Sequence, residues 1–422
     1  MTETMRRQTP AADLKNLSKP ELLAPAGGME QLKAAVRFGA DAVYLGAQKF
    51  GLRAFAGNFN EDDLSAAVDF AHGKGVKVYV TVNAFLYDDD ISGVKKTFEQ
   101  VQKSGADAAI ISDFAALTLA KEAAPGLKLH ISTQANTLNS MGALHWHQLG
   151  ASRIILAREL SLDRIAKMRQ NLPEGLELEA FVHGAMCVSY SGRCVLSNHL
   201  SGRDANQGQC AQPCRWKYAL VEEKRPGEYM PVFEDEKGSY IYSANDLCMI
   251  EHIDKLCAAG LGSLKIEGRM KTEYYVATVV SAYRKAIDSF FESPDLYRSI
   301  KDELKNEVCR ASHRPLSTGF YFGRPSPTVS SDYSQDSVYV AAVLSYDNES
   351  KTAAIRQKNR FFSGEELALL SPAGTRPIKI SGLRDEEGNE VESAPHPMQR
   401  LTIDAPFPMN EGDIIRRDVI KK

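Results

Sequence analysis

Short apolar segments rich in β-branched residues alternate with segments of helical periodicity along the first two-thirds of the chain. Met29–Phe38, Asp62–His72 and Leu162–Gln170 are examples of the helical segments, with apolar residues at helical spacing. Apolar strands that alternate with helices indicate a parallel sheet covered by helices on both faces. The expected strands are Glu21–Ala24, Ala42–Gly46, Lys77–Asn83, Ala108–Ser112, Lys128–Ser132, Ser152–Ala157, Leu178–His183 and Ser263–Glu267.

A recurrent Gly-Ala-Asp tripeptide indicates that one structural unit is repeated. It stands directly before an expected strand at residues 39–41 and 105–107, and residues 150–152 are a Gly-Ala-Ser variant. Glycine suits the end of a helix, where the chain turns into the next strand. Eight strands in about 250 residues predict a TIM-type (β/α)8 barrel. An open doubly wound sheet is the alternative, because closure of a sheet is not visible in a sequence.

The expected seventh and eighth strands are separated by a large insertion, at about residues 184–261, which holds most of the cysteines. The segment after a barrel strand emerges at the C-terminal face, where catalytic groups lie. We therefore expect the insertion to lie over the active site. The expected domains are an N-terminal extension (1–20), the barrel with its insertion (21–312), a Pro-rich linker (313–330) and a small all-β, barrel-like domain with short strands and Gly, Asn and Pro turns (331–422).

Composition indicates a soluble cytoplasmic protein. The chain has no apolar stretch long enough for a membrane span or a signal peptide, so we expect no membrane association. Its net charge is −3, so no overall basic character points to nucleic acid, although a local basic patch can bind phosphate on such a protein. In a reducing compartment its 7 cysteines are not expected to form a disulfide framework.

Four cysteines gather in one Gly-rich and polar segment, which favours a metal site over core packing. Cys187, Cys194, Cys210 and Cys214 fall within 28 residues. The paired Cys-x-x-Cys knuckles that are typical of zinc sites are absent from the sequence. An iron–sulfur cube needs only four thiolates that converge from loops, so irregular spacing suits it. The spacing alone leaves zinc and iron–sulfur both open.

The segment Glu179–Ser197 matches the signature of the collagenase-like peptidase family of unknown catalytic type, peptidase family U-thirty-two. The Leu22–Gly28 opening, the Val43–Gly46 strand and the Lys265–Lys271 strand end are also similar to that family. The resemblance covers essentially the whole chain. A barrel followed by one small β domain, with Arg215 and Trp216 after the cysteines, most resembles the prephenate-dependent tRNA uridine hydroxylases within this family.

The resemblance implies an activity, a cofactor and partners. The activity is oxygen-independent hydroxylation of tRNA to 5-hydroxyuridine at the wobble position, with prephenate as the hydroxyl donor. The cofactor is a 4Fe–4S cluster, and the partners are tRNA and a candidate sister subunit of the same family. The implied cluster ligands are Cys187, Cys194, Cys210 and Cys248. Cys214 is then a bystander, and we expect Cys257 and Cys309 to pack in the core.

Proteolysis, which the family name suggests, is the alternative activity, and hydroxylation of another RNA or aromatic substrate is a further one. The sequence contains neither a His-Glu-x-x-His zinc motif nor a Gly-x-Ser-x-Gly elbow. A dyad of Cys187 with His183 would be the candidate protease centre. A thiolate that binds iron cannot also act as the nucleophile, so we favour hydroxylation.

Candidate substrate contacts combine cations, an aromatic ring and amides near the expected barrel mouth. Cations position phosphates and an indole can stack on a base, although Trp216 could equally be a packing anchor. The eighth strand ends in alternating charges that could bind a dianion such as prephenate or form a structural ion pair. The amides could contact the base or cap loops. The substrate-binding candidates are Arg193, Arg203, Arg215, Trp216, Asn83, Gln134 and Asn136, and the catalytic candidates are Lys265, Glu267, Arg269 and His183.

Overall fold

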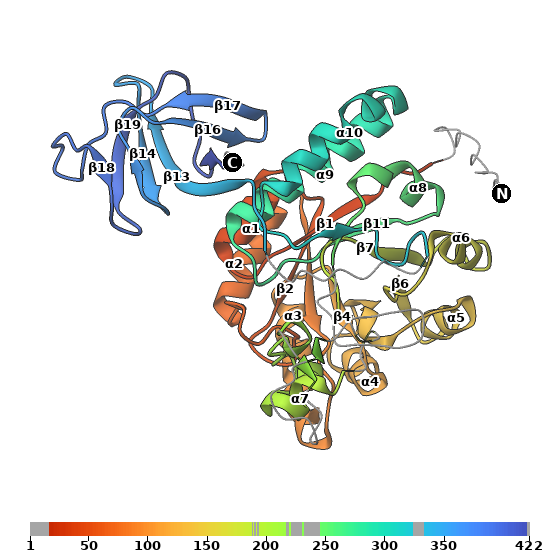
Figure 1. Cartoon of the computed structure of the whole chain (residues 1–422). Helices are drawn as coiled ribbons and strands as arrows, with labels where there is room; N and C mark the ends of the chain where they lie inside the picture. The colour runs from red at the N-terminus through yellow and green to blue at the C-terminus, as the bar shows by residue number, and fades with distance from the viewer. Residues whose placement is uncertain are drawn as a thin grey trace, which may run out of the picture.

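The computed structural model describes residues 17–187, 189, 191, 194–216, 219–220, 230–231, 245–323 and 333–419. Eight parallel strands form a closed barrel surrounded by helices (Figure 1). The last barrel strand, β11, pairs with both β1 and β7, and these pairings close the sheet. The predicted TIM-type barrel is therefore confirmed. In spatial order the barrel strands are β1 (Glu21–Pro25), β2 (Ala42–Gly46), β3 (Lys77–Val82), β4 (Ala108–Ile111), β5 (Lys128–Ile131), β6 (Ala151–Ile155), β7 (Glu177–Ala185) and β11 (Ser263–Ile266).

The helices around the barrel begin where the sequence supplies capping side chains. Asn60 accepts a hydrogen bond from the backbone N–H of Asp63, and Thr272 caps the long helix α9 in the same way. Ser293 caps the next helix, which begins with proline, a residue suited to the first helical turn. The helices are α1 (Met29–Arg37), α2 (Glu61–His72), α3 (Ile91–Lys103), α4 (Phe114–Ala123), α5 (Ser140–Gln148), α6 (Leu162–Gln170), α8 (Ile253–Ala258), α9 (Glu273–Glu292) and α10 (Pro294–Cys309).

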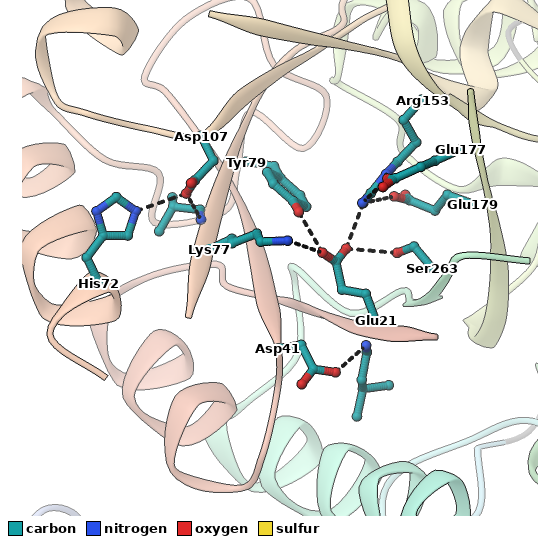
Figure 2. Close-up of polar contacts among 12 residues, drawn as sticks. Glu21, Asp41, His72, Lys77, Tyr79, Asp107, Arg153, Glu177, Glu179 and Ser263 are labelled. Atoms are coloured by element: carbon teal, nitrogen blue, oxygen red, sulfur yellow. Dashed lines mark hydrogen bonds and ion pairs between the residues drawn. The ribbon is translucent and has the colours of Figure 1, made fainter. Parts of the chain in front are cut away.

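The Gly-Ala-Asp repeats mark the turns that lead into the strands. Gly39, Gly105 and Gly150 have φ values of 99°, 79° and 102°, which glycine adopts without strain. The aspartates then bind backbone: Asp41 accepts from the N–H of Leu22 at 2.8 Å, and Asp107 accepts from that of Val78 at 2.8 Å (Figure 2). Each repeat therefore joins two neighbouring strands at the N-terminal end of the barrel.

The insertion crosses the C-terminal ends of the strands and then returns to the barrel wall. Backbone hydrogen bonds from Ala54 to Gly208 and from Phe85 to Asn206 connect it to the loops after β2 and β3. Its last strand, β10, pairs antiparallel with the end of β7. The described elements of the insertion are α7 (Leu196–Ser201), the 3-10 turns η4 (Ala205–Gln207) and η5 (Pro213–Arg215), β8 (Ala219–Leu220), β9 (Met230–Pro231), β10 (Asp246–Cys248), η6 (Ile250–His252) and α8.

The beginning of the expected linker packs on the barrel. Arg314 is fully buried and pairs with Asp246 of β10 at 2.6 Å. Strand β12 (Leu316–Ser317) adds to β10, and the Tyr321 hydroxyl bonds to the carbonyl oxygen of Phe181 at 2.5 Å. Residues 313–323 are thus part of the barrel wall.

The C-terminal domain is an antiparallel sheet with its own apolar core, coloured blue in Figure 1. Its strand order is β17-β16-β20-β13-β14-β19, and β15 and β18 form a separate pair. The strands are β13 (Ser337–Asp347), β14 (Thr352–Gln357), β15 (Phe361–Phe362), β16 (Glu366–Ser371), β17 (Gly374–Lys379), β18 (Ser393–Ala394), β19 (Arg400–Asp404) and β20 (Ile414–Asp418).

This domain is docked on α1, α9 and α10 by aromatic and ionic contacts. The ring of Tyr339 stacks on Tyr274 with centroids 5.4 Å apart, and Lys358 pairs with Glu273 at 2.6 Å. Arg416 is fully buried and pairs with Glu307 of α10 at 2.5 Å. No helix within the described residues is long and apolar enough to cross a membrane.

Candidate functional site

A cavity of about 410 Å³ opens at the C-terminal ends of the barrel strands, beneath the insertion. Its size is within the range of small-molecule sites. Apolar side chains such as Ile110, Ile155 and Phe181 line part of the wall, whereas the cations and cysteines come from the strand ends, the loops that follow them and the insertion. The cavity therefore combines an apolar, aromatic wall with concentrated positive charge.

Two arginines face one carboxylate on the cavity wall. Glu267, directly after β11, lies 3.5 Å from Arg53 Nη2 and 3.9 Å from Arg158 Nη2. Burial alone would raise the pKa of Glu267, but Arg53 and Arg158 together with nearby cations lower it, so the carboxylate is ionised. The guanidinium of Arg158 also stacks on the Phe181 ring, 4.4 Å from its centroid. A single carboxylate thus forms long ion pairs with two arginines.

Arg269 holds the loop that presents Arg53. It donates to the carbonyl oxygen of Leu52 at 2.8 Å and to Thr81 Oγ1 at 3.1 Å, and it also bonds to Asn58. Burial lowers the pKa of Arg269 to about 10. Arg269 therefore lines the cavity, but these three hydrogen bonds are made to the protein itself.

Gly46, at the end of β2, makes room for Arg269. A Cβ at this position would overlap the Arg269 guanidinium and would lie 2.7 Å from Asn58 Oδ1. We expect Gly46→Ala to displace the arginine, to lower the free energy of unfolding by about 1–3 kcal/mol and to weaken ligand binding in the cavity. Chemical denaturation measures the first effect. Gly175→Ala is the matched control, because a Cβ there meets nothing within 4 Å, and equal losses for the two variants would contradict this account.

The floor of the cavity rests on a buried ionic network. Lys265 Nζ lies 3.0 Å from Glu179 Oε1, and Arg153 Nη1 lies 3.1 Å from Glu179 Oε2. Arg153 also pairs with Glu21 and Glu177 at the N-terminal end of the barrel (Figure 2). Burial lowers the pKa of Lys265, although Glu179 opposes the shift. Lys265 lines the cavity, so the network connects the floor of the site to the opposite end of the barrel.

Four cysteines line the cavity: Cys187, Cys194, Cys210 and Cys214. The pKa of Arg53 is raised by Glu267 first, and Cys210 and Cys187 add to the effect, so this cation lies close to the thiols. Among the described residues, no three His, Cys, Asp or Glu side chains are spaced to hold a metal as they stand. The thiols fit an iron–sulfur cluster in ligand type and in sharing one cavity.

Cys248 lies deeper than the other candidate ligands. It stands opposite His183 in the β10–β7 ladder, and His183 precedes Cys187 by four residues. Burial raises the pKa of its thiol to about 11, and it is not among the described residues that line the cavity. Cys248 thus lies outside the described cavity lining, whereas Cys214 is part of it.

His183 lies on the helix side of β7. Only 2% of its surface is exposed, and its ring lies 5.5 Å from that of Tyr283 on α9. Burial lowers the pKa of His183 to about 3, so the imidazole is neutral at physiological pH. Among the described residues that line the cavity, Cys187 is present and His183 is absent. The structure separates the two members of the candidate protease dyad.

Of the three candidate amides, all of which the structure describes, two line the cavity and one does not. Asn83 and Gln134 line the cavity, and Asn83 accepts from the backbone N–H of Leu52 at 3.2 Å. Asn136 ends a 3-10 turn, η3 (Thr133–Ala135), in the left-handed conformation. Both amides predicted after β5 thus lie in one turn, but only Gln134 is among the described cavity residues.

The cations and the tryptophan of the insertion lie farther out. Arg203 lines the cavity, with its guanidinium 4.7 Å from the centroid of the Phe55 ring, and Phe55 is 60% exposed. Trp216 is 48% exposed and is not among the described cavity residues. Arg193 and the side chain of Arg215 lie outside the described residues.

Sequence reasoning missed Arg53, Arg158 and Phe55. Arg158 directly follows the expected strand Ser152–Ala157, so a search for charged residues just after each expected strand would have found it. Arg53 and Phe55 lie in the loop after β2, where the sequence offers no motif. Their position became visible only through the contacts of that loop with Arg269 and Asn83.

The fold and the site define a (β/α)8-barrel protein with a cationic, cysteine-lined cavity at the C-terminal mouth. The chain belongs to peptidase family U32. The model of "Peptidase family U32" matches residues 27–331, and that of "Peptidase family U32 C-terminal domain" matches residues 335–416. The family expected from the sequence is confirmed, and the second match coincides with the antiparallel sheet.

Three relatives match most of the chain. It is 38% identical to tRNA hydroxylation protein P1 of Bacillus subtilis over 386 residues, 90% of both chains. It is 34% identical to tRNA hydroxylation protein P of Escherichia coli over 420 residues, 89% of this chain and 92% of the relative. It is 33% identical to a protein named Collagenase of Porphyromonas gingivalis over 387 residues, 88% of this chain and 91% of the relative.

Proposed function

We propose that this chain is a tRNA-modifying enzyme that forms 5-hydroxyuridine at the wobble position. The observation that carries the proposal is the 38% identity to a tRNA hydroxylation protein across 90% of both chains, which includes the barrel and the C-terminal domain. The cavity supports it chemically, because its size suits one nucleobase or one small acid. The proposed location is the cytoplasm, where tRNA is modified.

The described cavity residues can bind a flipped-out base and its backbone. Arg203 and the exposed Phe55 ring form a stacked pair at the mouth, an arrangement that suits unpaired bases and phosphates. Asn83 and Gln134 offer amides to the edge of a base inside the cavity. We propose that tRNA binds across this mouth, and that Trp216 and the basic residues of the insertion extend the same surface.

We further propose that the cavity thiols hold a 4Fe–4S cluster. Cys187, Cys194 and Cys210 are three of its ligands, and Cys248 is the fourth, as the family resemblance implies. A bound cluster supplies an electron-transfer or Lewis-acid centre beside the substrate. The cations around the cavity would together balance the negative charge that four thiolates bring.

Replacing C5–H of uracil by C5–OH oxidises the ring, so a co-substrate must deliver oxygen and accept electrons. We propose that prephenate is this donor and that molecular oxygen is not required. The cationic wall of the cavity, with one carboxylate for two arginines, suits an organic dianion. Glu267 and Lys265 then face the donor or the base, and Lys265 is the candidate for handling the proton at C5.

Cells blocked before prephenate in aromatic biosynthesis test the donor and the activity together. We expect their tRNA to lack 5-hydroxyuridine-derived nucleosides even when this chain is present, and we expect added prephenate to restore them. Liquid chromatography with mass spectrometry of digested tRNA is the measurement. The control is the unblocked parent strain grown without oxygen, in which the nucleosides should persist. Nucleosides that depend on oxygen and not on prephenate would rule out this donor.

Proteolysis is the second candidate, since one relative is named Collagenase. The structure gives it little support, because His183 is buried against Tyr283 while Cys187 lines the cavity. A nucleophilic cysteine needs a base within hydrogen-bond reach. Hydroxylation of another RNA or of another aromatic substrate would use the same cavity. We also propose a sister subunit of the same family as a protein partner.

A further inference from the structure

Arg53 and Arg158 have more hydrogen-bonding capacity than the described protein groups use. Within the described residues, both arginines form ion pairs with Glu267, at 3.5 and 3.9 Å, which are long distances for a charge-assisted hydrogen bond. Arg158 Nε is buried and has no hydrogen-bond partner within the described part of the chain. A buried donor without a partner is costly, so it points to a group that the site is built to receive.

The backbone at Arg53 is held in an uncommon conformation. Its φ is 71°, and two other non-glycine residues of the same loop, Phe50 and Asn58, also have positive φ values. Such conformations cost about 1 kcal/mol or more each and persist only where the surroundings fix them. Here the N–H of Leu52 bonds to Asn83 and its carbonyl oxygen to Arg269. The fold thus holds this loop so that Arg53 faces the cavity.

Arg158 lies deep in the cavity, beside an aromatic wall. Its side chain is 14% exposed, and its guanidinium covers the Phe181 ring at 4.4 Å. Stacking fixes the plane of the guanidinium and leaves its edge for a planar, two-oxygen anion. The polyanionic backbone of an RNA cannot enter a cavity of about 410 Å³, and its phosphates are better placed at the mouth, near the exposed Arg203.

We propose that Arg53 and Arg158 form an anion subsite that binds a carboxylate group of a small organic-acid co-substrate. This inference rests on the proposed function and names the residues that receive its donor. Glu267 keeps the two guanidinium groups on one side of the cavity, and the ring of Phe181 lies beside the carbon skeleton of the bound acid. RNA phosphate is the other source of anionic oxygen, and the test separates the two.

Isothermal titration of prephenate into the purified full chain tests the subsite. We expect Arg158→Gln and Arg53→Gln to weaken prephenate binding at least tenfold. Lys49→Gln is the matched control, because it removes the same charge from the same loop at an exposed position outside the described cavity lining, and it should change affinity less than twofold. Affinity for unmodified tRNA, measured by filter binding, should change less than twofold in both arginine variants.

Other outcomes would contradict either the assignment of the subsite or the identity of the donor. A loss of tRNA affinity with unchanged prephenate affinity would assign the arginines to phosphate. A loss of iron and sulfide from Arg53→Gln and Arg158→Gln would assign them to the cluster. Phenylpyruvate is an aromatic acid with one carboxylate. If the protein binds phenylpyruvate through these arginines but does not bind prephenate, the subsite is supported and prephenate is excluded as the donor. Wild-type protein that binds neither acid would overturn both.

Discussion

Alanine at Cys187, Cys194 or Cys210 is expected to abolish the iron and sulfide that the wild-type protein takes up on anaerobic reconstitution. All three thiols line the cavity at the barrel mouth. A 4Fe–4S cube normally has four thiolate ligands, so the loss of one leaves it labile. Iron and sulfide assays together with the visible absorption spectrum measure the effect. Cys257→Ala and Cys309→Ala are controls that should keep most of the iron, because these cysteines belong to helices α8 and α10.

For the fourth cluster ligand, the family resemblance and the structure favour different cysteines. The resemblance implies Cys248, so we expect Cys248→Ala to lose the cluster and Cys214→Ala to keep most of it. The structure places Cys214 in the cavity and Cys248 in the β10–β7 ladder. If Cys214→Ala loses the cluster and Cys248→Ala keeps it, the cavity geometry identifies the ligand set and the carry-over from the family is wrong at this position.

Glu179→Gln is expected to lower the free energy of unfolding by about 3–5 kcal/mol, because it leaves the buried Lys265 without its paired carboxylate and removes one of the three carboxylates that pair with Arg153. Glu179 is completely buried and lies within 3.1 Å of both Lys265 and Arg153. Urea denaturation measures the change. Glu177→Gln is the matched control, since Glu177 pairs with the same Arg153 but is 53% exposed, and it should cost no more than about 1 kcal/mol.

A second substitution checks that the loss comes from unpaired charge. Adding Lys265→Met to Glu179→Gln removes the cation that lost its paired carboxylate, so the double variant should recover part of the lost stability. Equal costs for Glu179→Gln and Glu177→Gln, or no recovery in the double variant, would show that the network does not support the floor of the cavity.

The barrel could be predicted because both faces of its parallel strands are buried, which leaves continuous apolar runs in the sequence. Closure could not be predicted, since it requires the last barrel strand, β11, to pair with the first, β1, as well as with β7, and the residues of β1 and β11 lie far apart in the chain. In the C-terminal domain the sequence does not mark β20 as a central strand, although it lies between β16 and β13. This strand contains Arg416, a residue that would be unusual in a sheet core without its partner Glu307.

Sequence reasoning identified the parts of the candidate site that belong to short local motifs. The cysteine block and the charges after β11 lie in short segments, so sequence alone brought Cys187, Cys194, Lys265 and Glu267 together. Arg53 and Arg158 belong to separate loops, and their common partner Glu267 is distant in sequence from both. The position of His183 was also hidden, because a strand residue faces either the barrel interior or the helices, and β7 ends irregularly where its register with β11 shifts.

The most direct test of the proposed function is nucleoside analysis of tRNA from cells that carry this chain as their one member of the family. Deleting its gene should remove 5-hydroxyuridine-derived nucleosides from wobble positions. Wild-type protein should restore them, and Cys187→Ala should not. An unchanged nucleoside profile after deletion would contradict the account, and cleavage of gelatin by the purified metal-free protein would then favour proteolysis.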